Sequence, residues 1–528
     1  MLSHRANPKK TPIAKSFITL TNTLCTISEQ RCYDKDAQRR ALLAIDTCRR
    51  FRFAELTLQE RAVKRRESKC LNGSQTDMVS RLPTEIYAMI IKHLVNDRSG
   101  KSPEEMELRA LTLTSLASTC RIFQILCERY LYTNPRSQRL SESVESQWLL
   151  HFALAVEPRR AHTIRSLRCE SWPPCFQYEA WLETLRLCTN LTHLELVWTY
   201  STPENIVERL GNMVAACPKV SEFSYGGLWT WNFFNESRAT TVEKTAKFSH
   251  RYTKFAKQLC HLDISGSINC ITEILHFDYP DLKSLTVDIV DCVKGDEFFQ
   301  DLSSHTPNLE RLELHWVEEL SLNDLRTGFK AWGKTLRSLA INHPIIRYLS
   351  DGILVHILPH LPRLEELCMG PQPRFCLLDL HAIAQPDAPR LKVFRWRVDE
   401  AMFHDPLANS ETVNQAIIDI FTTHSETLNT FIIDQEFDFW NFGTDIFKHL
   451  QKAKNLENLR VPLHDIPTKE EIQGLITACP KLGKPDTRLV VVREFLTECT
   501  LRTINYKEDN VEVVEGSWGS VRHPMRWS

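Results

Sequence analysis

The sequence is poor in glycine and has no long apolar run. It contains 16 glycines among 528 residues, which argues against collagen-like chains and against sandwiches built on many tight turns. The longest apolar segment, WLLHFALAV at 148–156, has about half of the roughly 18 residues that a membrane-spanning helix needs. We therefore expect no association with a membrane.

The 17 cysteines lack any spacing that indicates disulfides or a metal site. No two of them form a CxxC pair, and the N-terminal segment MLSHRANPKKTPIAKSFITL lacks the continuous apolar core of a secretory signal. We expect reduced cysteines that act as small buried hydrophobes, in a protein of the cytoplasm, the nucleus or both. A mitochondrial transit peptide is the alternative interpretation of this basic N-terminus.

No excess of one charge marks the chain as a whole. The 65 Lys and Arg nearly balance the 66 Asp and Glu, so a polycation for nucleic acid is not expected. The N-terminal part differs, because residues 1–80 hold 16 basic and 8 acidic residues. We interpret residues 1–77 as a basic, partly disordered extension. A nuclear-import or nucleic-acid patch around Lys64–Arg66 is the alternative.

Catalytic and metal-binding motifs are also missing. The sequence contains no GxxxxGK[ST], GxGxxG, HExxH or GxSxG segment. His356 and His360 are four residues apart, but Pro359 between them disfavours a shared helical face. Cys169 and Cys175 have no matching second pair. We expect no catalytic residue, no cofactor and no metal.

A helical unit is predicted for residues 78–133. Pro83 suits the first turn of a helix, because its missing N–H would have no partner there. Ser102-Pro-Glu-Glu105 is a capping box that predicts the start of a second helix, and SLASTCRIFQILCERYLY at 115–132 predicts a third. Three short helices cannot bury all of their apolar faces against one another. We therefore expect a partner to cover part of this unit.

These residues resemble an F-box, the motif that docks on the Skp-family adaptor of cullin–RING ubiquitin ligases. The matching elements are LPxEI at 82–86, IxxxL at 90–94 and LxxxCRxF at 116–123, whereas the connection at 95–110 is longer than in the family. The resemblance implies binding to the adaptor and, through it, to a cullin. The residues expected to contact the adaptor are Leu82, Pro83, Ile86, Ile90, Leu94, Leu116, Cys120 and Phe123. Residues 134–163, read as a helical linker broken at Pro158, look like the bridge that follows the motif in many fungal F-box proteins.

From Ile164 onward the chain repeats itself. An apolar anchor is followed by apolar residues three and five positions later, in eleven copies at successive spacings of 27, 29, 39, 23, 27, 27, 28, 27, 37 and 28 residues. Leucine-rich repeats have periods of about 20–29 residues. The anchors are Ile164, Leu191, Val220, Leu259, Leu282, Leu309, Leu336, Leu364, Leu391, Leu428 and Leu456.

Proline and insertions punctuate these repeats. Five prolines precede a listed anchor by two residues, where proline ends a helix and favours an extended strand: Pro218, Pro280, Pro307, Pro362 and Pro389. Pro480 stands in the same way before Leu482, where we expect a degenerate last copy to begin. The two long spacings indicate insertions at 226–258 and 397–427. We predict an α/β chain in which the three-helix F-box unit precedes a leucine-rich-repeat solenoid, or horseshoe, over 164–487. Residues 488–528, with a strand in RLVVVREFL and a hairpin after it, are expected to cap the solenoid.

Alternation along each strand separates core from surface. Leu309, Leu312 and Leu314 should point into the core, and the residues between them onto the concave sheet face. This face and the aromatic run WTWNFFN are expected to bind a target protein. The candidate residues are Arg311, Glu313, His315, Arg395, Arg397, Trp229, Trp231, Phe233 and Phe234.

Three functions fit these observations. The resemblance implies a non-catalytic substrate-recognition subunit of an SCF-type ubiquitin ligase, whose F-box binds the adaptor and whose repeats bind the target. The first alternative is a leucine-rich-repeat scaffold or regulatory protein that acts outside ubiquitination. The second is an enzyme with a site in the repeat concavity, since catalytic groups can assemble from residues that lie far apart in sequence.

Overall fold

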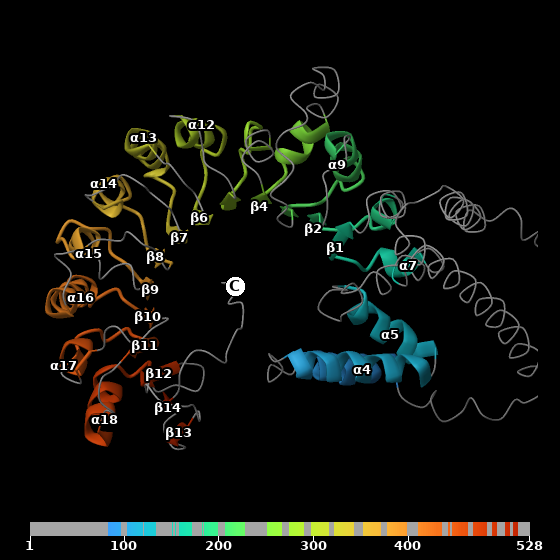
Figure 1. The fold of residues 1–528 in the computed structure, drawn as a ribbon. Coiled ribbons are helices and arrows are strands. Elements are labelled where there is room, and N and C mark those ends of the chain that lie inside the picture. The colour runs from blue at the N-terminus through green and yellow to red at the C-terminus, as the bar shows by residue number, and fades with distance from the viewer. Residues whose placement is uncertain are drawn as a thin grey trace, which may run out of the picture. The chain divides into compact units, whose positions relative to one another are not determined.

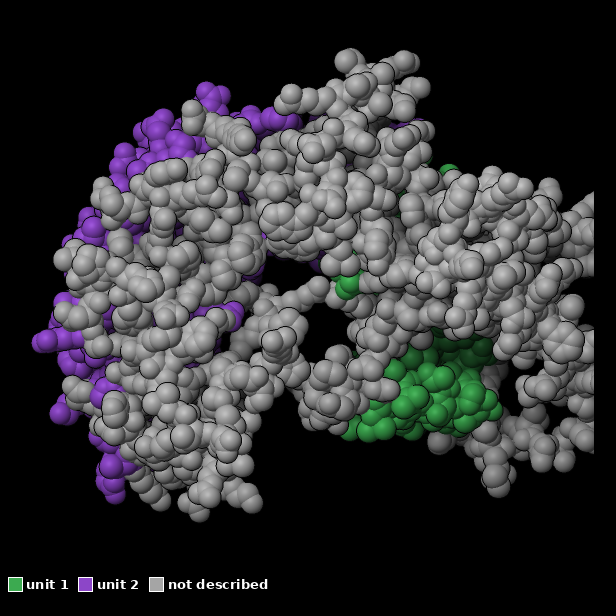
Figure 2. All heavy atoms as spheres, viewed as in Figure 1, with its two compact units in different colours: residues 1–219 green, residues 220–528 purple. Residues whose placement is uncertain are grey.

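The structure is a computed structural model whose chain divides into two compact units, residues 1–219 and residues 220–528 (Figure 2). It describes residues 83–96, 103–119, 121–133, 150, 154, 158–171, 182, 184–198, 206–227, 251–266, 274–289, 297–315, 321–342, 352–370, 377–398, 410–435, 442–443, 446–462, 468–482, 488–493, 502–506 and 511–515. Within these residues, no helix combines the length and the apolar character that crossing a bilayer requires.

The first unit contains the predicted helices. They are α3 (Thr84–Asn96), α4 (Pro103–Thr119) and α5 (Arg121–Leu131). Pro103 opens α4, as the capping-box pattern predicts, and Pro83 lies one residue before α3. The helices share a small core, in which Ile91, Leu113 and Cys127 are at most 1% exposed. Tyr87 and Phe123 add an edge-to-face contact at 5.0 Å between ring centroids.

The third helix is shorter than the sequence predicts. The expected helix at 115–132 is divided, because α4 continues to Thr119 and α5 begins at Arg121. Thr119 and Ser118 donate to the carbonyls of Leu116 and Ser115 in the last turn of α4. Thr112 and Thr114 make bonds of the same kind within α4, so the hydroxyls alone do not account for the end of the helix.

The rest of the first unit holds the first two repeats. Its elements are α7 (Pro158–Ala161), β1 (Ser166–Ser171), β2 (His193–Trp198) and α9 (Ile206–Ala215), with β1 and β2 parallel. Leu150 and Leu154 are helical and buried, as the predicted linker helix requires. Pro158 begins the short helix α7, which is the position that proline favours.

The second unit is a curved array with strands inside and helices outside (Figure 1). Its strands are β3 (Glu222–Gly227), β4 (His261–Gly266), β5 (Ser284–Ile289), β6 (Arg311–His315), β7 (Ser338–Asn342), β8 (Glu366–Met369), β9 (Val393–Val398), β10 (Thr430–Gln435), β11 (Asn458–Pro462), β12 (Arg488–Arg493), β13 (Arg502–Tyr506) and β14 (Val511–Glu515). Neighbours from β3 to β12 follow chain order, as in a solenoid.

The outer layer is helical and varies in length. Its helices are α12 (Phe298–His305), α13 (Leu322–Trp332), α14 (Leu354–Ile357), η3 (Leu358–His360), α15 (Leu377–Ile383), α16 (Ser410–His424), α17 (Ile446–Leu450) and α18 (Lys469–Ala478). The predicted second insertion at 397–427 contains α16, whose Val413, Ile417 and Phe421 are at most 1% exposed. This spacing therefore reflects a long repeat helix packed on the core.

The repeat pattern is confirmed strand by strand. Each of the eleven anchors lies two residues before a strand and is at most 1% exposed. Pro307 illustrates the position of these prolines between helix and strand, since it follows the end of α12 at His305 and precedes the buried Leu309. Leu312 and Leu314 also face the core, as predicted. The α/β repeat fold is thus as the periodicity indicates.

The C-terminal strands continue the sheet. β12 pairs in parallel with β14, and β14 pairs antiparallel with β13. The predicted strand in RLVVVREFL and the predicted hairpin after it are both present. β12 therefore gains a backbone partner on the side away from β11.

Buried aspartates connect neighbouring helices of the outer layer. The carboxylate of Asp324, in the first turn of α13, accepts hydrogen bonds at 2.8 Å from the N–H groups of Phe299 and Gln300 in α12. Asp379 of α15 does the same for the N–H of Leu354, which opens α14, at 2.6 Å. Asp324 lies 25 and 24 residues after its two partners, and Asp379 lies 25 residues after Leu354. Each one satisfies N–H groups that have no partner within their own helix.

Replacing Asp324 should therefore destabilise the second unit. In Asp324→Ala, the buried N–H of Phe299 and the partly buried N–H of Gln300 lose their acceptor, so we expect the free energy of unfolding to fall by about 2–3 kcal/mol. Urea denaturation of the full chain measures this. Asn323→Ala, at the exposed neighbouring position, is the control and should change stability by less than about 0.5 kcal/mol. Equal stability of the two variants would contradict the capping role.

Candidate functional site

The outer face of α3 exposes a row of apolar side chains. Ile86, Met89, Ile90 and Leu94 are 39%, 65%, 46% and 38% exposed. They recur at helical spacing, whereas Tyr87 and Ile91 on the opposite side are buried. Burial of one such side chain contributes about 1.5–3 kcal/mol. We call these four residues the α3 apolar face.

The other predicted adaptor residues lie in different surroundings. Pro83 is exposed beside the α3 apolar face. Leu116 on α4 and Phe123 on α5 are half-buried against the core of the helical unit. Leu82 and Cys120 lie outside the described residues. Three further apolar side chains of the unit, which the sequence pattern did not single out, are 66%, 59% and 48% exposed: Leu108, Leu111 and Ile125.

The inner face of the second unit carries paired polar side chains. Arg311, Glu313 and His315 of β6 alternate with the buried leucines, as predicted, so they point to the inner face of the sheet. They are nevertheless not independent contact groups. His315 Nε2 lies 3.0 Å from Glu313 Oε1, Arg311 Nη2 lies 3.8 Å from Glu313 Oε2, and Glu313 is only 8% exposed.

His315 is the centre of a cluster that extends over neighbouring strands. Burial lowers the pKa of His315, but the hydrogen bond and charge of Glu313, with the charges of Asp288 and Asp263, outweigh it and leave the pKa raised. The amide Nδ2 of Asn342 on β7 is 3.5 Å from His315 Nε2. Burial also raises the pKa of Asp288, against the opposing charge of His315. We call Asp263, Asp288, Glu313 and His315 the histidine–carboxylate cluster.

A second polar cluster lies on β9, β10 and β11. Arg460 Nε is 2.6 Å from Asp434 Oδ1, and both side chains are less than one-fifth exposed. Burial raises the pKa of Asp434, and the charges of Arg460, Arg397 and Arg395 oppose this shift. The predicted Arg395 is half-buried and Arg397 is exposed. The inner face is therefore acidic around β4–β6 and basic around β9–β11.

The position of a residue relative to its anchor would have identified the members of these polar clusters that the sequence analysis did not name. These are Asp263, Asp288, Asn342, Asp434 and Arg460, and each lies four or six residues after its anchor, as Glu313 and His315 do. The aromatic candidates Trp229, Trp231, Phe233 and Phe234 lie outside the described residues.

Reactive groups are few among the residues that the structure describes. Burial raises the pKa of the Cys368 thiol, on β8, to about 11, so it stays protonated at neutral pH. The described cysteines are free thiols and mostly buried, as expected. His356 Nδ1 lies 2.7 Å from Arg326 Nη2, so this ring nitrogen is engaged by the guanidinium. One group of side chains could hold a metal: His276, Asp301 and His305.

Comparison with known proteins adds little. No protein-family model and no curated protein matches the chain. A solved structure, the crystal structure of Rad7 and Elc1 complex in yeast, is similar at 13% sequence identity and a TM-score of 0.38, over 73% of this chain and 92% of that chain. This degree of likeness carries no argument. The fold assignment depends on the strands and helices of this chain itself.

The raised pKa of His315 predicts a pH-dependent contribution to stability. The folded state binds the His315 proton more tightly than the unfolded state, so the stabilisation is present below about pH 6.5, the usual imidazole pKa, and is lost as pH rises through the higher folded value. His315→Gln should therefore lower the free energy of unfolding more at pH 5.5 than at pH 8.5.

Urea denaturation at both pH values measures this difference. His261→Gln, which replaces an exposed histidine of β4, is the control and should show a smaller pH-dependent change. A loss for His315→Gln that is the same at both pH values would contradict the charge coupling.

Proposed function

We propose that this protein is the substrate-recognition subunit of an SCF-type ubiquitin ligase. The α3 apolar face would dock on the Skp-family adaptor, and through it on a cullin, while the repeats hold a target protein. One observation carries the proposal. The residues that match the F-box motif, Ile86, Ile90 and Leu94, leave their apolar side chains in solvent although the same helix buries its other side. Contiguous exposed apolar surface is typical of protein interaction sites.

The chain needs no catalytic group of its own in this role. A receptor that holds its target beside the charged ubiquitin carrier makes the transfer effectively intramolecular. The titratable groups of the inner face pair with one another, as Asp434 does with Arg460 and Glu313 with His315. A scaffold outside ubiquitination predicts the same surfaces but no adaptor binding, so adaptor binding separates these two proposals.

Truncation of the α3 apolar face should abolish adaptor binding. In Ile86→Ala with Ile90→Ala, each lost anchor costs about 2 kcal/mol, or roughly 30-fold in affinity. Co-purification of the full chain with a Skp-family adaptor measures this, and Leu82→Ala with Pro83→Ala should have the same effect. Val355→Ala with Leu378→Ala is a matched control, since these exposed apolar residues lie on the repeat helices. Unchanged binding by both motif variants would contradict the F-box assignment.

Target binding should depend on a separate surface. We propose that the inner-face residues Arg311, Glu313, His315, Arg395 and Arg397 give selectivity and that aromatic residues of the insertion supply most of the binding free energy. Trp229→Ala with Trp231→Ala should weaken recovery of the target at least tenfold and leave adaptor binding unchanged. Quantitative mass spectrometry of co-purified proteins measures both in one experiment.

Thermal unfolding of the same variant tests the assignment. Tryptophans that serve as binding anchors can be removed with little change in stability. If unfolding is instead destabilised by the ~3–5 kcal/mol typical of a buried aromatic residue, they belong to the core and the target-site assignment is wrong.

A further inference from the structure

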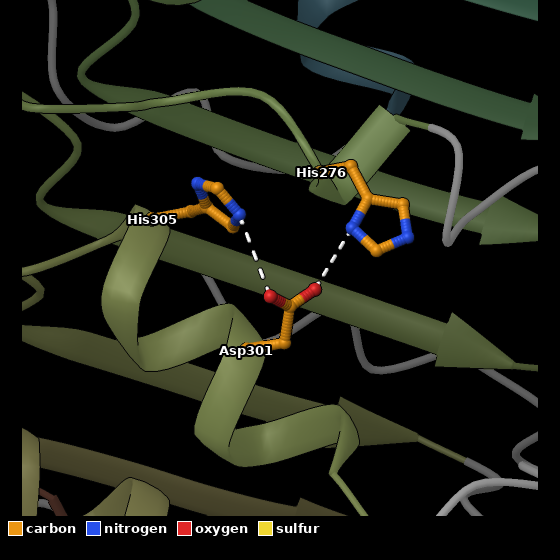
Figure 3. Close-up of side chains that lie close together, drawn as sticks. All are labelled: His276, Asp301 and His305. Atoms are coloured by element: carbon orange, nitrogen blue, oxygen red, sulfur yellow. Dashed lines mark ion pairs between the residues drawn. The ribbon is translucent and has the colours of Figure 1, made fainter.

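Two histidines and an aspartate meet on the helical side of the repeats that contain β5 and β6. Asp301 and His305 lie four residues apart on α12, so they share one face of that helix. His276 belongs to the segment at 274–280, which precedes the anchor of β5. Figure 3 shows both imidazole rings directed at the carboxylate of Asp301. This is the one group of potential metal ligands found within the described residues.

The two elements are held together independently of this cluster. The N–H of Tyr279 donates to the carbonyl of His305 at 2.8 Å, and the Tyr279 hydroxyl donates to the carbonyl of Ile274 at 2.6 Å. Ile274 and Tyr279 are at most 2% exposed. The backbone positions of His276 and His305 are thus set by buried neighbours. Fixed ligand positions reduce the cost of ordering a metal site.

The distances suit a small divalent ion. His276 Nδ1 is 2.8 Å from Asp301 Oδ2, and His305 Nε2 is 3.5 Å from Asp301 Oδ1. Bonds of about 2.0–2.1 Å in tetrahedral geometry place ligand atoms about 3.3 Å apart. The three ligand atoms lie within 4.8 Å of one another. The His276 side chain is 63% exposed, so it can rotate to bring its nitrogen to the separation that the metal requires.

Asp278 orients one of the ligands. Its Oδ1 lies 2.8 Å from Nδ1 of His305, so this nitrogen is engaged outside the cluster and Nε2 is the nitrogen that faces Asp301. A carboxylate behind a histidine is the usual outer support of a metal-bound imidazole, because it fixes the tautomer and the ring orientation.

We propose that His276, Asp301 and His305 form a binding site for a zinc-type divalent transition-metal ion, with Asp278 positioning His305. Two imidazoles and one carboxylate suit Zn²⁺, Co²⁺ and Ni²⁺ better than Mg²⁺ or Ca²⁺, which prefer oxygen alone. The bound ion connects two successive repeats and, by binding the folded state, stabilises them. Three protein ligands leave a coordination position for water. This inference is independent of the proposed adaptor and target.

Cobalt titration of the reduced full chain tests the site, because Co²⁺ bound to nitrogen and oxygen differs in its absorption from Co²⁺ bound to thiolate. We expect one saturable nitrogen/oxygen site that Zn²⁺ displaces. His276→Ala with His305→Ala should remove it, and Asp301→Asn should weaken it at least tenfold. Asp278→Asn should weaken it about tenfold, as expected for loss of an outer carboxylate. His381→Gln, at an exposed histidine in the last turn of α15, is the matched control and should bind as the wild type does.

Thermal unfolding gives a second readout. Zn²⁺ should raise the Tm of the wild type and of His381→Gln, but not that of the double variant, whose Tm without metal should match the wild type. Equal Co²⁺ affinity of the wild type and the double variant would overturn the proposal. So would a saturable signal with thiolate absorption alone.

Discussion

The buried anchor of each repeat is the contact on which the rest of the structure depends. Ile164 and its ten equivalents are at most 1% exposed, each two residues before a strand. A single strand and helix cannot bury such a residue without the neighbouring repeat, so the repeats are stable only together. The backbone reinforces this arrangement at the residue after the anchor. The N–H of Glu310 donates to the carbonyl of Lys283, and the N–H of Arg337 donates to that of Glu310, as at each later repeat up to Glu457.

Polar side chains at fixed positions relative to the anchor determine how each repeat aligns with the preceding one. Asn308 and Asn455, one residue before their anchors, donate to carbonyls of the preceding repeats at 2.8 and 2.7 Å. The aspartate caps of the outer layer act between neighbours in the same way, because Asp324 satisfies the N–H groups that open α12. A shift of the chain by one residue would lose these bonds together with anchor burial. Apolar burial therefore supplies most of the stabilisation, and the polar contacts select one register.

The sequence predicted what depends on local pattern and missed what depends on neighbouring repeats. The anchors and strands follow from residues within five positions of each other, so periodicity located all eleven. The division between α4 and α5 was missed because the apolar spacing of Leu116, Phe123 and Cys127 continues across it. The metal-ligand group was missed for another reason. Asp278 and His305 are 27 residues apart, which is one repeat period, and each lies four residues before an anchor. A comparison of residues at the same position in successive repeats would therefore have placed them side by side.

In the proposed role, pairing on the inner face would limit how a target can be recognised there. Glu313 and Asp434 already have partners at 3.0 and 2.6 Å, so a bound protein must compete with His315 or Arg460 for them. The net gain in free energy is then the difference between the new ion pair and the one that it replaces, which is small. A protein with the wrong charge at this position would be repelled, and no such exchange offsets that cost. Such a face would discriminate between targets better than it would hold them. The apolar side chains of α3 have no such competitor, because water is all that they give up on docking. The proposed selectivity for the target and the proposed affinity for the adaptor therefore lie on different surfaces of the same chain.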